Sequence, residues 1–184
     1  MKIDVLDNFH RLLHPRATVF VISSWNDKPN MMTCAWNMPV SKDPPMVAIA
    51  LSRESYTNEL IRKSGEFTIN IPDEKLLNAL WVCGTRSGRK VDKAKLAGLK
   101  LSPSRKVKPP IVEDCIGHLE CKLYKFFEVG ECTVFIGEVL EAYASKEAFS
   151  QGVWNVKRIR LPMHLGGDRF AIPTEVVKPQ KRRS

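Results

Sequence analysis

Three short stretches of the chain carry the side chains most able to hold a ligand, and the first suits an anion. Residues 52–57, Ser-Arg-Glu-Ser-Tyr-Thr, follow an apolar segment and precede a predicted helix. The hydroxyls of Ser52 and Thr57, the guanidinium of Arg53 and free helix N–H groups would meet there, a natural phosphate-binding combination. Ordinary N-capping of the helix by Ser55 or Thr57, with Arg53 in solvent, is the alternative.

The second stretch is TRSGRKVDK, residues 85–93, between the end of one predicted helix and the start of the next. It again combines hydroxyls and a glycine with cations, among them Ser87, Arg89 and Lys93. Such a loop can form a second anion site, and a solvated basic loop is the alternative.

The third stretch, Thr33-Cys34-Ala35-Trp36, has small side chains where a core strand would carry branched ones. A planar ring system held by backbone contacts needs small neighbours so that its edge can reach N–H and C=O groups. Trp36 could then wall one side of the ring, although two closely packed sheets would also favour small residues. Together with two anion sites, this platform describes a flat cofactor that carries a phosphate. Nucleotides and flavin mononucleotide (FMN) both qualify.

Other patterns that carry catalysis are absent from the sequence, which has no GxGxxG, GxxxxGK[ST], HExxH or GxSxG motif. His10 and His14 stand four residues apart on one predicted helix, but no third metal ligand accompanies them. We therefore interpret all four histidines as surface or cap residues: His10, His14, His118 and His164. The five cysteines include no CxxC pair and are expected to be reduced thiols. We therefore predict no metal site and no catalytic side chain.

Length and composition describe one globular domain. A chain of 184 residues with 43% hydrophobic and 27% charged residues can bury one core, but is short for two domains. We assign residues 1–175 to a single domain and 176–184 to a basic tail. No apolar run is long enough to span a membrane, and the N-terminus lacks the apolar core of a signal peptide. A cytoplasmic protein without a membrane partner is predicted.

The formal net charge of +9 is concentrated in loops and in the tail. Four positive charges lie in the last seven residues, and much of the remainder lies in TRSGRKVDKAK and SRKVKPP. A nucleic-acid-binding protein would more typically place its cations along one element, with interleaved aromatic residues. We therefore predict anion sites and no nucleic-acid partner, and keep a basic nucleic-acid-binding barrel as an alternative.

Strands dominate the elements that must position these stretches. Branched, aromatic or alternating residues predict strands at 18–25, 46–51, 66–71, 116–127, 132–143 and 169–172, with residues 31–37 returning antiparallel to the first of them and PVSKDPP as a turn. Caps and apolar stripes predict short helices at 6–13, 57–63, 73–84, 91–97 and 146–151, the third with a stripe of Leu76, Leu77, Leu80 and Trp81. Frequent hairpins without β-α-β alternation favour a mainly β fold, a closed or nearly closed antiparallel barrel with short helical insertions.

The order of several motifs resembles that of the flavin reductase-like proteins. NMMTCAWNMPVSKDPPMVAIAL followed by SRESYTNELIRKSGEFTINIP is similar to the family's Trp-containing strand, its "PVS…PP" turn, its Arg-x-x-x-Thr phosphate turn and its "sGeFxvN" strand. SGRKVDKAKLAGL, LECKLYKFFEVGECTVFIGEVLEAY and LPMHLGGDRF resemble later segments, so the likeness covers about residues 10–172. Archaeal ferric reductases and flavoredoxins look most similar.

The resemblance implies an FMN-binding split barrel with antiparallel Greek-key topology, a homodimer with flavin sites near the interface, and hydride chemistry at the flavin. It implies roles for three sets of residues. Thr33, Cys34, Ala35 and Trp36 would line the isoalloxazine; Ser52, Arg53 and Thr57 would hold the phosphate; and Ser87, Arg89 and Lys93 would contact ribityl or phosphate. His164 would lie near the open face where nicotinamide docks. The hairpin turn reads VGEC where many members have Gly-Asp-His, so no histidine stands at that position to contact nicotinamide.

The first functional hypothesis is an FMN-dependent oxidoreductase that takes electrons from NAD(P)H and delivers them to free flavin, ferric complexes or a partner redox protein. A one-electron FMN carrier without nicotinamide activity is the second. Because the cofactor carries the reaction and the protein supplies binding, orientation and electrostatics, no side-chain acid or base is required.

Overall fold

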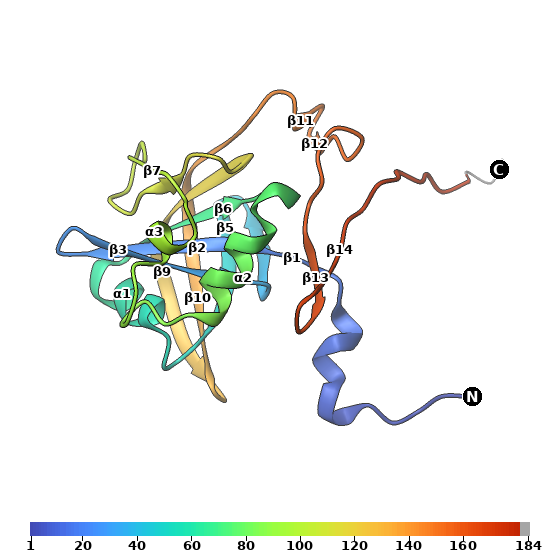
Figure 1. Ribbon diagram of the computed structural model, residues 1–184, viewed down its shortest axis with the longest axis horizontal. Coiled ribbons are helices and arrows are strands. Elements are labelled where there is room, and N and C mark those ends of the chain that lie inside the picture. The colour runs from blue at the N-terminus through green and yellow to red at the C-terminus, as the bar shows by residue number, and fades with distance from the viewer. Residues whose placement is uncertain (181–184) are drawn as a thin grey trace.

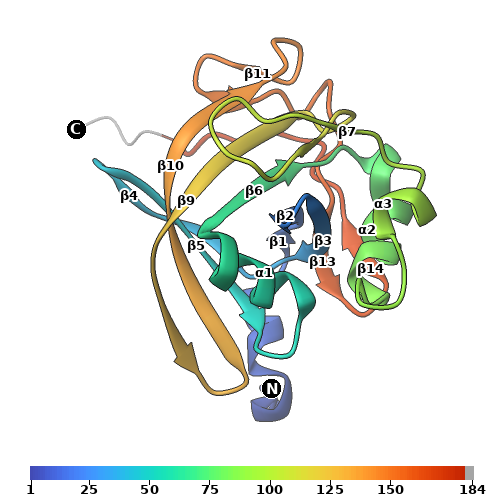
Figure 2. The same ribbon diagram turned by 90° about the vertical axis from the view of Figure 1, so that its left-hand side faces the viewer.

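The computed structural model describes residues 1–180, so the end of the predicted basic tail lies outside the described residues. A seven-stranded antiparallel sheet forms the body of the molecule (Figures 1 and 2), with strands in the order β3-β2-β6-β9-β10-β5-β4. In chain order these strands are β2 (Val19–Trp25), β3 (Lys28–Cys34), β4 (Asn37–Lys42), β5 (Pro45–Ser52), β6 (Glu66–Ile71), β9 (Gly117–Val129) and β10 (Cys132–Ala144).

The sheet curls until its first and last strands meet. The connection Ala35-Trp36 leads from β3 at one edge to β4 at the other, and the Ala50 N–H of β5 donates to the Trp36 carbonyl at 2.9 Å. The predicted mainly β, antiparallel fold is confirmed as a split barrel of this kind. The small-residue stretch of the sequence lies at the seam where the barrel nearly closes.

Two apolar clusters explain why β2 begins with four consecutive apolar residues. Val19 and Val21 face the barrel interior, whereas Phe20 and Ile22 pack on the opposite face beneath α2 (Leu77–Thr85). A strand buried on both faces cannot alternate with polar residues. Inside the barrel, any side chain at Gly137 of β10 would overlap the buried ring of Phe67, so this position requires glycine.

Short helices are inserted between the strands, as predicted. They are a 3₁₀ helix at Leu6–Leu13, α1 at Tyr56–Ser64, a 3₁₀ turn at Glu74–Leu76 that leads into α2, and α3 at Lys93–Leu96. Ser55 caps α1 by accepting from the Asn58 N–H at 3.2 Å, and Gly65 ends it with φ of +70°. The left-handed conformation favours glycine at that position.

Two predicted boundaries were wrong for local reasons. Residues 39–42 of the expected turn belong to strand β4, because β4 is an edge strand and tolerates Pro39 without losing a ladder partner. The helix predicted at 146–151 is a turn followed by a small hairpin, β11 (Phe149–Ser150) and β12 (Val153–Trp154), in which the rings of Phe149 and Trp154 pack 5.1 Å apart.

The remaining short strands form two small sheets: β1 (Arg16–Ala17) with β13 (Met163–Gly166) and β14 (Arg169–Ala171), and β7 (Leu101–Ser102) with β8 (Ile111–Val112). The first of these joins the two ends of the chain beside the barrel (Figure 1). All five cysteines are free thiols. Across residues 1–180, none of the helices combines the length and apolar character needed to cross a membrane.

Candidate functional site

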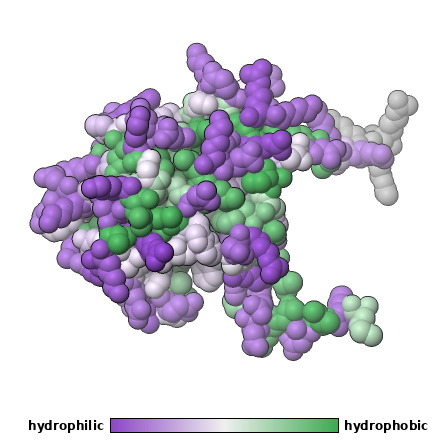
Figure 3. Space-filling model, in the orientation of Figure 1, coloured by the Kyte–Doolittle hydropathy of each residue, from purple (hydrophilic) through white to green (hydrophobic). Residues whose placement is uncertain are grey.

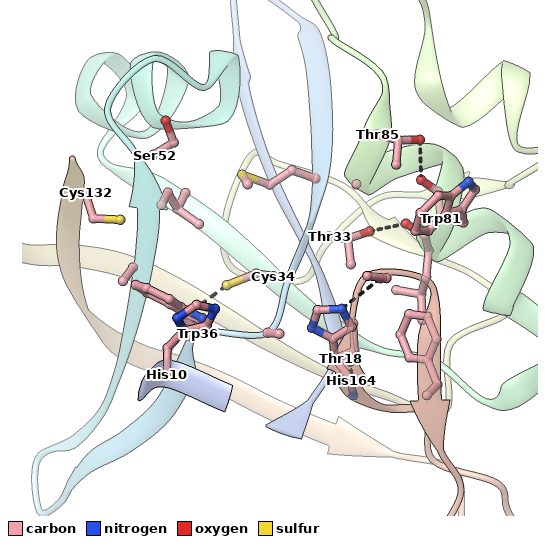
Figure 4. A pocket seen from close by; sticks show the side chains of 18 of the residues that line it. His10, Thr18, Thr33, Cys34, Trp36, Ser52, Trp81, Thr85, Cys132 and His164 are labelled. Carbon is pink, nitrogen blue, oxygen red and sulfur yellow. Dashed lines mark hydrogen bonds between the residues drawn. The ribbon is translucent and has the colours of Figure 1, made fainter. Parts of the chain in front are cut away.

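A cavity of about 530 Å³ opens beside the seam of the barrel (Figure 4). Its walls are formed by the end of β3, the start of the loop before α1, α2, the β9–β10 turn and the β13–β14 hairpin. The residues that line it include His10, Thr18, Met32, Thr33, Cys34, Ala35, Trp36, Ala50, Ser52, Leu80, Trp81, Gly84, Thr85, Glu131, Cys132, His164, Gly167 and Phe170. Its volume is in the range of sites for small molecules and cofactors.

The small-residue stretch forms one wall of this cavity. Thr33, Cys34, Ala35 and Trp36 all line it, and the Trp36 side chain is 39% exposed. The buried Cys34 thiol donates to the Trp36 carbonyl at 3.4 Å, and burial raises the pKa of Cys34 to about 12. Cys34 is therefore a neutral packing residue and not a thiolate.

Close contact between β3 and α2 shapes the next wall. The Thr33 hydroxyl donates to the Leu80 carbonyl at 2.6 Å, and a Cβ at Gly84 would lie only 3.3 Å from the Cβ of Thr33. Because glycine allows this approach, α2 brings Trp81 and Thr85 to the cavity. The apolar stripe predicted for this helix was wrong for Trp81, which is 46% exposed and not in the core.

Histidines from both ends of the chain lie close together beside the cavity. His14 Nδ1 lies 2.8 Å from the His164 carbonyl, and the His10 ring lies 6.1 Å from the ring of Trp36. The Nε2 atom of His14 is buried without a hydrogen-bond partner. Desolvation, reinforced by His164, Arg11 and His10, holds the pKa of His14 below its ordinary value. His14 is the C-cap residue of the N-terminal helix, and His164 lines the cavity.

The β9–β10 turn supplies the part of the cavity nearest Ser52. Cys132 pairs with Ser52 across β10 and β5, and both line the cavity. Burial and the neighbouring Glu131 raise the pKa of Cys132. Cys132 therefore presents a neutral thiol to the cavity.

Arg53 follows Ser52 but directs its guanidinium elsewhere. Its backbone N–H donates to the Glu131 carbonyl at 3.0 Å, and its Nη1 lies 3.1 Å from a carboxylate oxygen of Glu128. Arg62 approaches the same carboxylate at 2.7 Å, and the two arginines lower the pKa of Glu128. The guanidinium of Arg53 thus lies outside the cavity lining, on the hairpin side of α1.

Thr57 lies deeper than the sequence suggested. It is 1% exposed, and its hydroxyl accepts from the Asn30 amide of β3 at 2.8 Å. Asn30 also packs against Gly88 of the second basic loop, where any side chain would overlap its Oδ1. Asn30 therefore joins the two stretches that were predicted to bind anions.

The second basic loop surrounds another cavity of about 440 Å³, lined in part by Asn30, Tyr56, Arg89 and Lys93. Arg89 lies over the Tyr56 ring at 4.8 Å and pairs with Glu59 at 2.7 Å. Lys93 is 7% exposed and donates to the Cys83 carbonyl at 2.8 Å, and desolvation lowers its pKa. Ser87 is exposed, and its hydroxyl accepts from the Arg89 N–H at 3.4 Å.

The predicted site residues therefore fall into two neighbouring groups. Thr33, Cys34, Ala35, Trp36, Ser52 and His164 share the first cavity; Thr57, Arg89 and Lys93 surround Asn30 and Tyr56, with Ser87 in the same loop; and Arg53 stands apart with Glu128. Strand β3 runs between the two groups, since it carries both Asn30 and Thr33.

These features fit a flat cofactor with a phosphate. Small side chains and Trp36 suit the ring, and Lys93 is a buried ammonium whose hydrogen bond in the described part of the chain is to a backbone carbonyl. A buried cation with such a partner is well placed to meet an anion. Four further residues at these cavities were not predicted as site residues: Asn30, Trp81, Thr85 and Phe170. The one available signal among them was an Asn directly before the apolar pair Met31-Met32.

Comparison with known proteins agrees with this geometry. Residues 10–162 match the family model described as the flavin reductase like domain. An uncharacterized protein of Pyrococcus abyssi is 38% identical over 148 residues, which are 80% of this chain and 85% of the relative.

Two solved structures are also similar. Flavoredoxin of Desulfovibrio vulgaris (Miyazaki F) is 26% identical, with a TM-score of 0.87 over 97% of each chain. An FMN-binding domain of a flavin reductases-like enzyme from Shewanella baltica is 25% identical, with a TM-score of 0.81 over 96% of each chain.

Proposed function

The chain belongs to the flavin reductase-like family of FMN-binding flavoproteins, and from that premise we propose that it is an FMN-dependent oxidoreductase. In this proposal NAD(P)H supplies electrons, and the flavin passes them to free flavin, a ferric complex or a partner redox protein. The observation that carries it is the cavity at the barrel seam, where a wall of small residues ends in Trp36.

FMN would lie along β3. Thr33, Cys34, Ala35 and Trp36 would hold the ring, while Thr57, Ser87, Arg89 and Lys93 would hold the ribityl and phosphate groups near Asn30. Ser52 would contribute from the shared wall. Arg53 would reach the phosphate only by exchanging its partner Glu128, so its role is the part of the assignment that depends most on rearrangement.

When bound, FMN accepts a hydride and releases electrons singly or in pairs. The residues of this chain would bind and orient it, and the wall at Trp36 would cover one side of the ring. Cations of the second basic loop would also favour the more negative, reduced form of a bound flavin. His164 would contact the nicotinamide at the side of the cavity formed by β13 and β14.

A homodimer is part of the same proposal. The N-terminal helix has no buried residue, and it exposes Leu6, Phe9, Leu12 and Leu13. Figure 3 shows apolar residues on this segment, which stands away from the body of the molecule. A groove of about 260 Å³ between Phe9 and Met38 continues the same apolar surface. A second copy of the chain would cover surface of this kind.

The free thiols accord with a cytoplasmic location, which is also part of this proposal.

Colour and reduction test the proposal. The purified protein should be yellow, and NADH or NADPH should bleach its flavin absorption under anaerobic conditions. Flavin that resists both nucleotides but is reduced by dithionite would instead establish the electron carrier, the role that the likeness to a flavoredoxin favours. A colourless protein that does not bind added FMN but does bind single-stranded nucleic acid would establish the nucleic-acid-binding barrel.

A further inference from the structure

Trp81 is a large apolar side chain of α2 that lies outside the hydrophobic core. Ala79, Leu80 and Cys83 of the same helix are buried, whereas the Trp81 indole is 46% exposed and lines the main cavity. Tryptophan carries a large apolar surface and a flat face suited to stacking. An indole left half-exposed inside a cavity is therefore available to a ligand.

The backbone at Trp81 is held firmly in place. The preceding carbonyl, that of Leu80, accepts from Thr33 at 2.6 Å, and the Trp81 carbonyl accepts from the Thr85 hydroxyl at 2.7 Å. Gly84 of the same helix packs closely against Thr33, since an added Cβ there would lie 3.3 Å from the Thr33 Cβ. Trp81 thus presents its ring from a fixed position relative to the small-residue wall.

The cavity contains two separate aromatic walls. Figure 4 shows Trp36 and Trp81 on opposite sides, with Thr33 between them. Behind Trp36 lies His10, and the remaining aromatic lining residues, His164 and Phe170, pack 5.3 Å from each other. If the wall at Trp36 takes the cofactor ring, the wall at Trp81 is left for a second flat ring.

We propose that Trp81 stacks on the ring of a conjugated cyclic electron acceptor, of which a para-quinone is the simplest type, and so determines which acceptors the protein reduces. This rests on the proposed function and selects a small flat acceptor over a ferric complex or a protein. Reduction of a quinone to a hydroquinone consumes two electrons and two protons. NAD(P)H supplies both electrons and one proton as a hydride, solvent supplies the other proton, and NAD(P)⁺ is released.

The test compares Trp81→Ala and Trp81→Phe with wild type. Trp25→Ala is the matched control, because Trp25 is similarly exposed, at 43%, and lies outside the cavity. Bound FMN is reduced with dithionite, and its reoxidation by menadione or by ferricyanide, which offers no ring to stack, is followed by stopped flow. This readout does not depend on the natural electron donor.

Trp81→Ala should lower the second-order rate constant with menadione by about five- to hundredfold, the range typical of losing one aromatic stack. Trp81→Phe should retain part of the rate, and the ferricyanide rate, the FMN affinity and the Trp25→Ala rates should not change. Equal menadione rates in wild type and Trp81→Ala would overturn the proposal. So would a parallel loss with ferricyanide, a fall in FMN affinity or a change in oligomeric state, each of which assigns Trp81 to the cofactor or to a subunit interface. Failure of the proposed function is distinct, since it would appear in wild type as absence of bound FMN or of reduction by NAD(P)H.

Discussion

Enlarging Ala35 should expel the cofactor without weakening the fold. Ala35 lies in the connection between β3 and β4, is half-buried and lines the main cavity. Ala35→Leu adds three carbons that point into space a flavin ring would take. Losing the ring contacts on this wall should cost about 3 kcal/mol, which is about a hundredfold in Kd.

The effect on stability separates this explanation from tight packing of sheets. Overpacking a true core position costs about 1–3 kcal/mol, and for a domain of this size that lowers Tm by about 2–12 °C. In the cavity, leucine meets little protein, so the Tm of flavin-free Ala35→Leu should stay close to that of the flavin-free wild type.

Ala79→Leu is the matched control, because Ala79 is buried in the cluster between α2 and the sheet. It should lower the Tm of the flavin-free protein. Calorimetry of the flavin-free proteins and titration with FMN measure both quantities on each variant. A lowered Tm with FMN affinity retained in Ala35→Leu would refute the assignment of this stretch to the flavin ring.

Three further predictions follow from other parts of the structure. Arg53→Ala should weaken FMN binding by about ten- to hundredfold, as expected for loss of a charge-assisted contact of about 1.5–3 kcal/mol. Riboflavin, which lacks the phosphate, should bind both proteins equally, and Arg62→Ala, which removes the other partner of Glu128, is the control. Unchanged FMN affinity in Arg53→Ala would contradict the phosphate role. Burial lowers the pKa of His118, whose Nδ1 lies 2.9 Å from Oδ1 of Asn70, from 6.5 to about 4. Because the unfolded chain takes up this proton first as pH falls, the free energy of unfolding should decrease from about pH 6.5 to about pH 4 by up to about 3 kcal/mol, and denaturant titrations in which His118→Gln keeps the same decrease would exclude this origin. Sedimentation at low micromolar concentration should show a homodimer, and a flavin-loaded monomer of 20.9 kDa would disprove the role proposed for the exposed N-terminal helix.

The strands and their pairing were readable from the sequence because their signals are local. A few neighbouring residues are enough to predict the strand at Val19-Phe20-Val21-Ile22, the helix end at Gly65 and the long hairpin around Gly130. The strand inside PVSKDPP was not readable, because only the edge position of β4 makes Pro39 acceptable.

The candidate site was predicted in its composition but not in its arrangement. Thr33 to Trp36 line the cavity as a local pattern suggested, yet Trp81 was predicted to lie in the core, since its spacing from Leu77 and Leu80 matches an apolar stripe. Helix α2 packs on β3 through the Leu80 carbonyl and Gly84, which both lie against Thr33, and Trp81 is left half-exposed at the cavity. No helical period can reveal a contact between residues so far apart in the chain.

The wall formed by β13 and β14 has a consequence for the order of events during synthesis. The seven-stranded sheet is complete at Ala144, whereas His164, Gly167 and Phe170 come later and beyond the segment 10–162 that matches the family model. A nascent chain can therefore pair every strand of the barrel before its cavity has all of its walls. The walls at β13 and β14 are therefore the last part of the cavity to be synthesised, after every strand of the barrel.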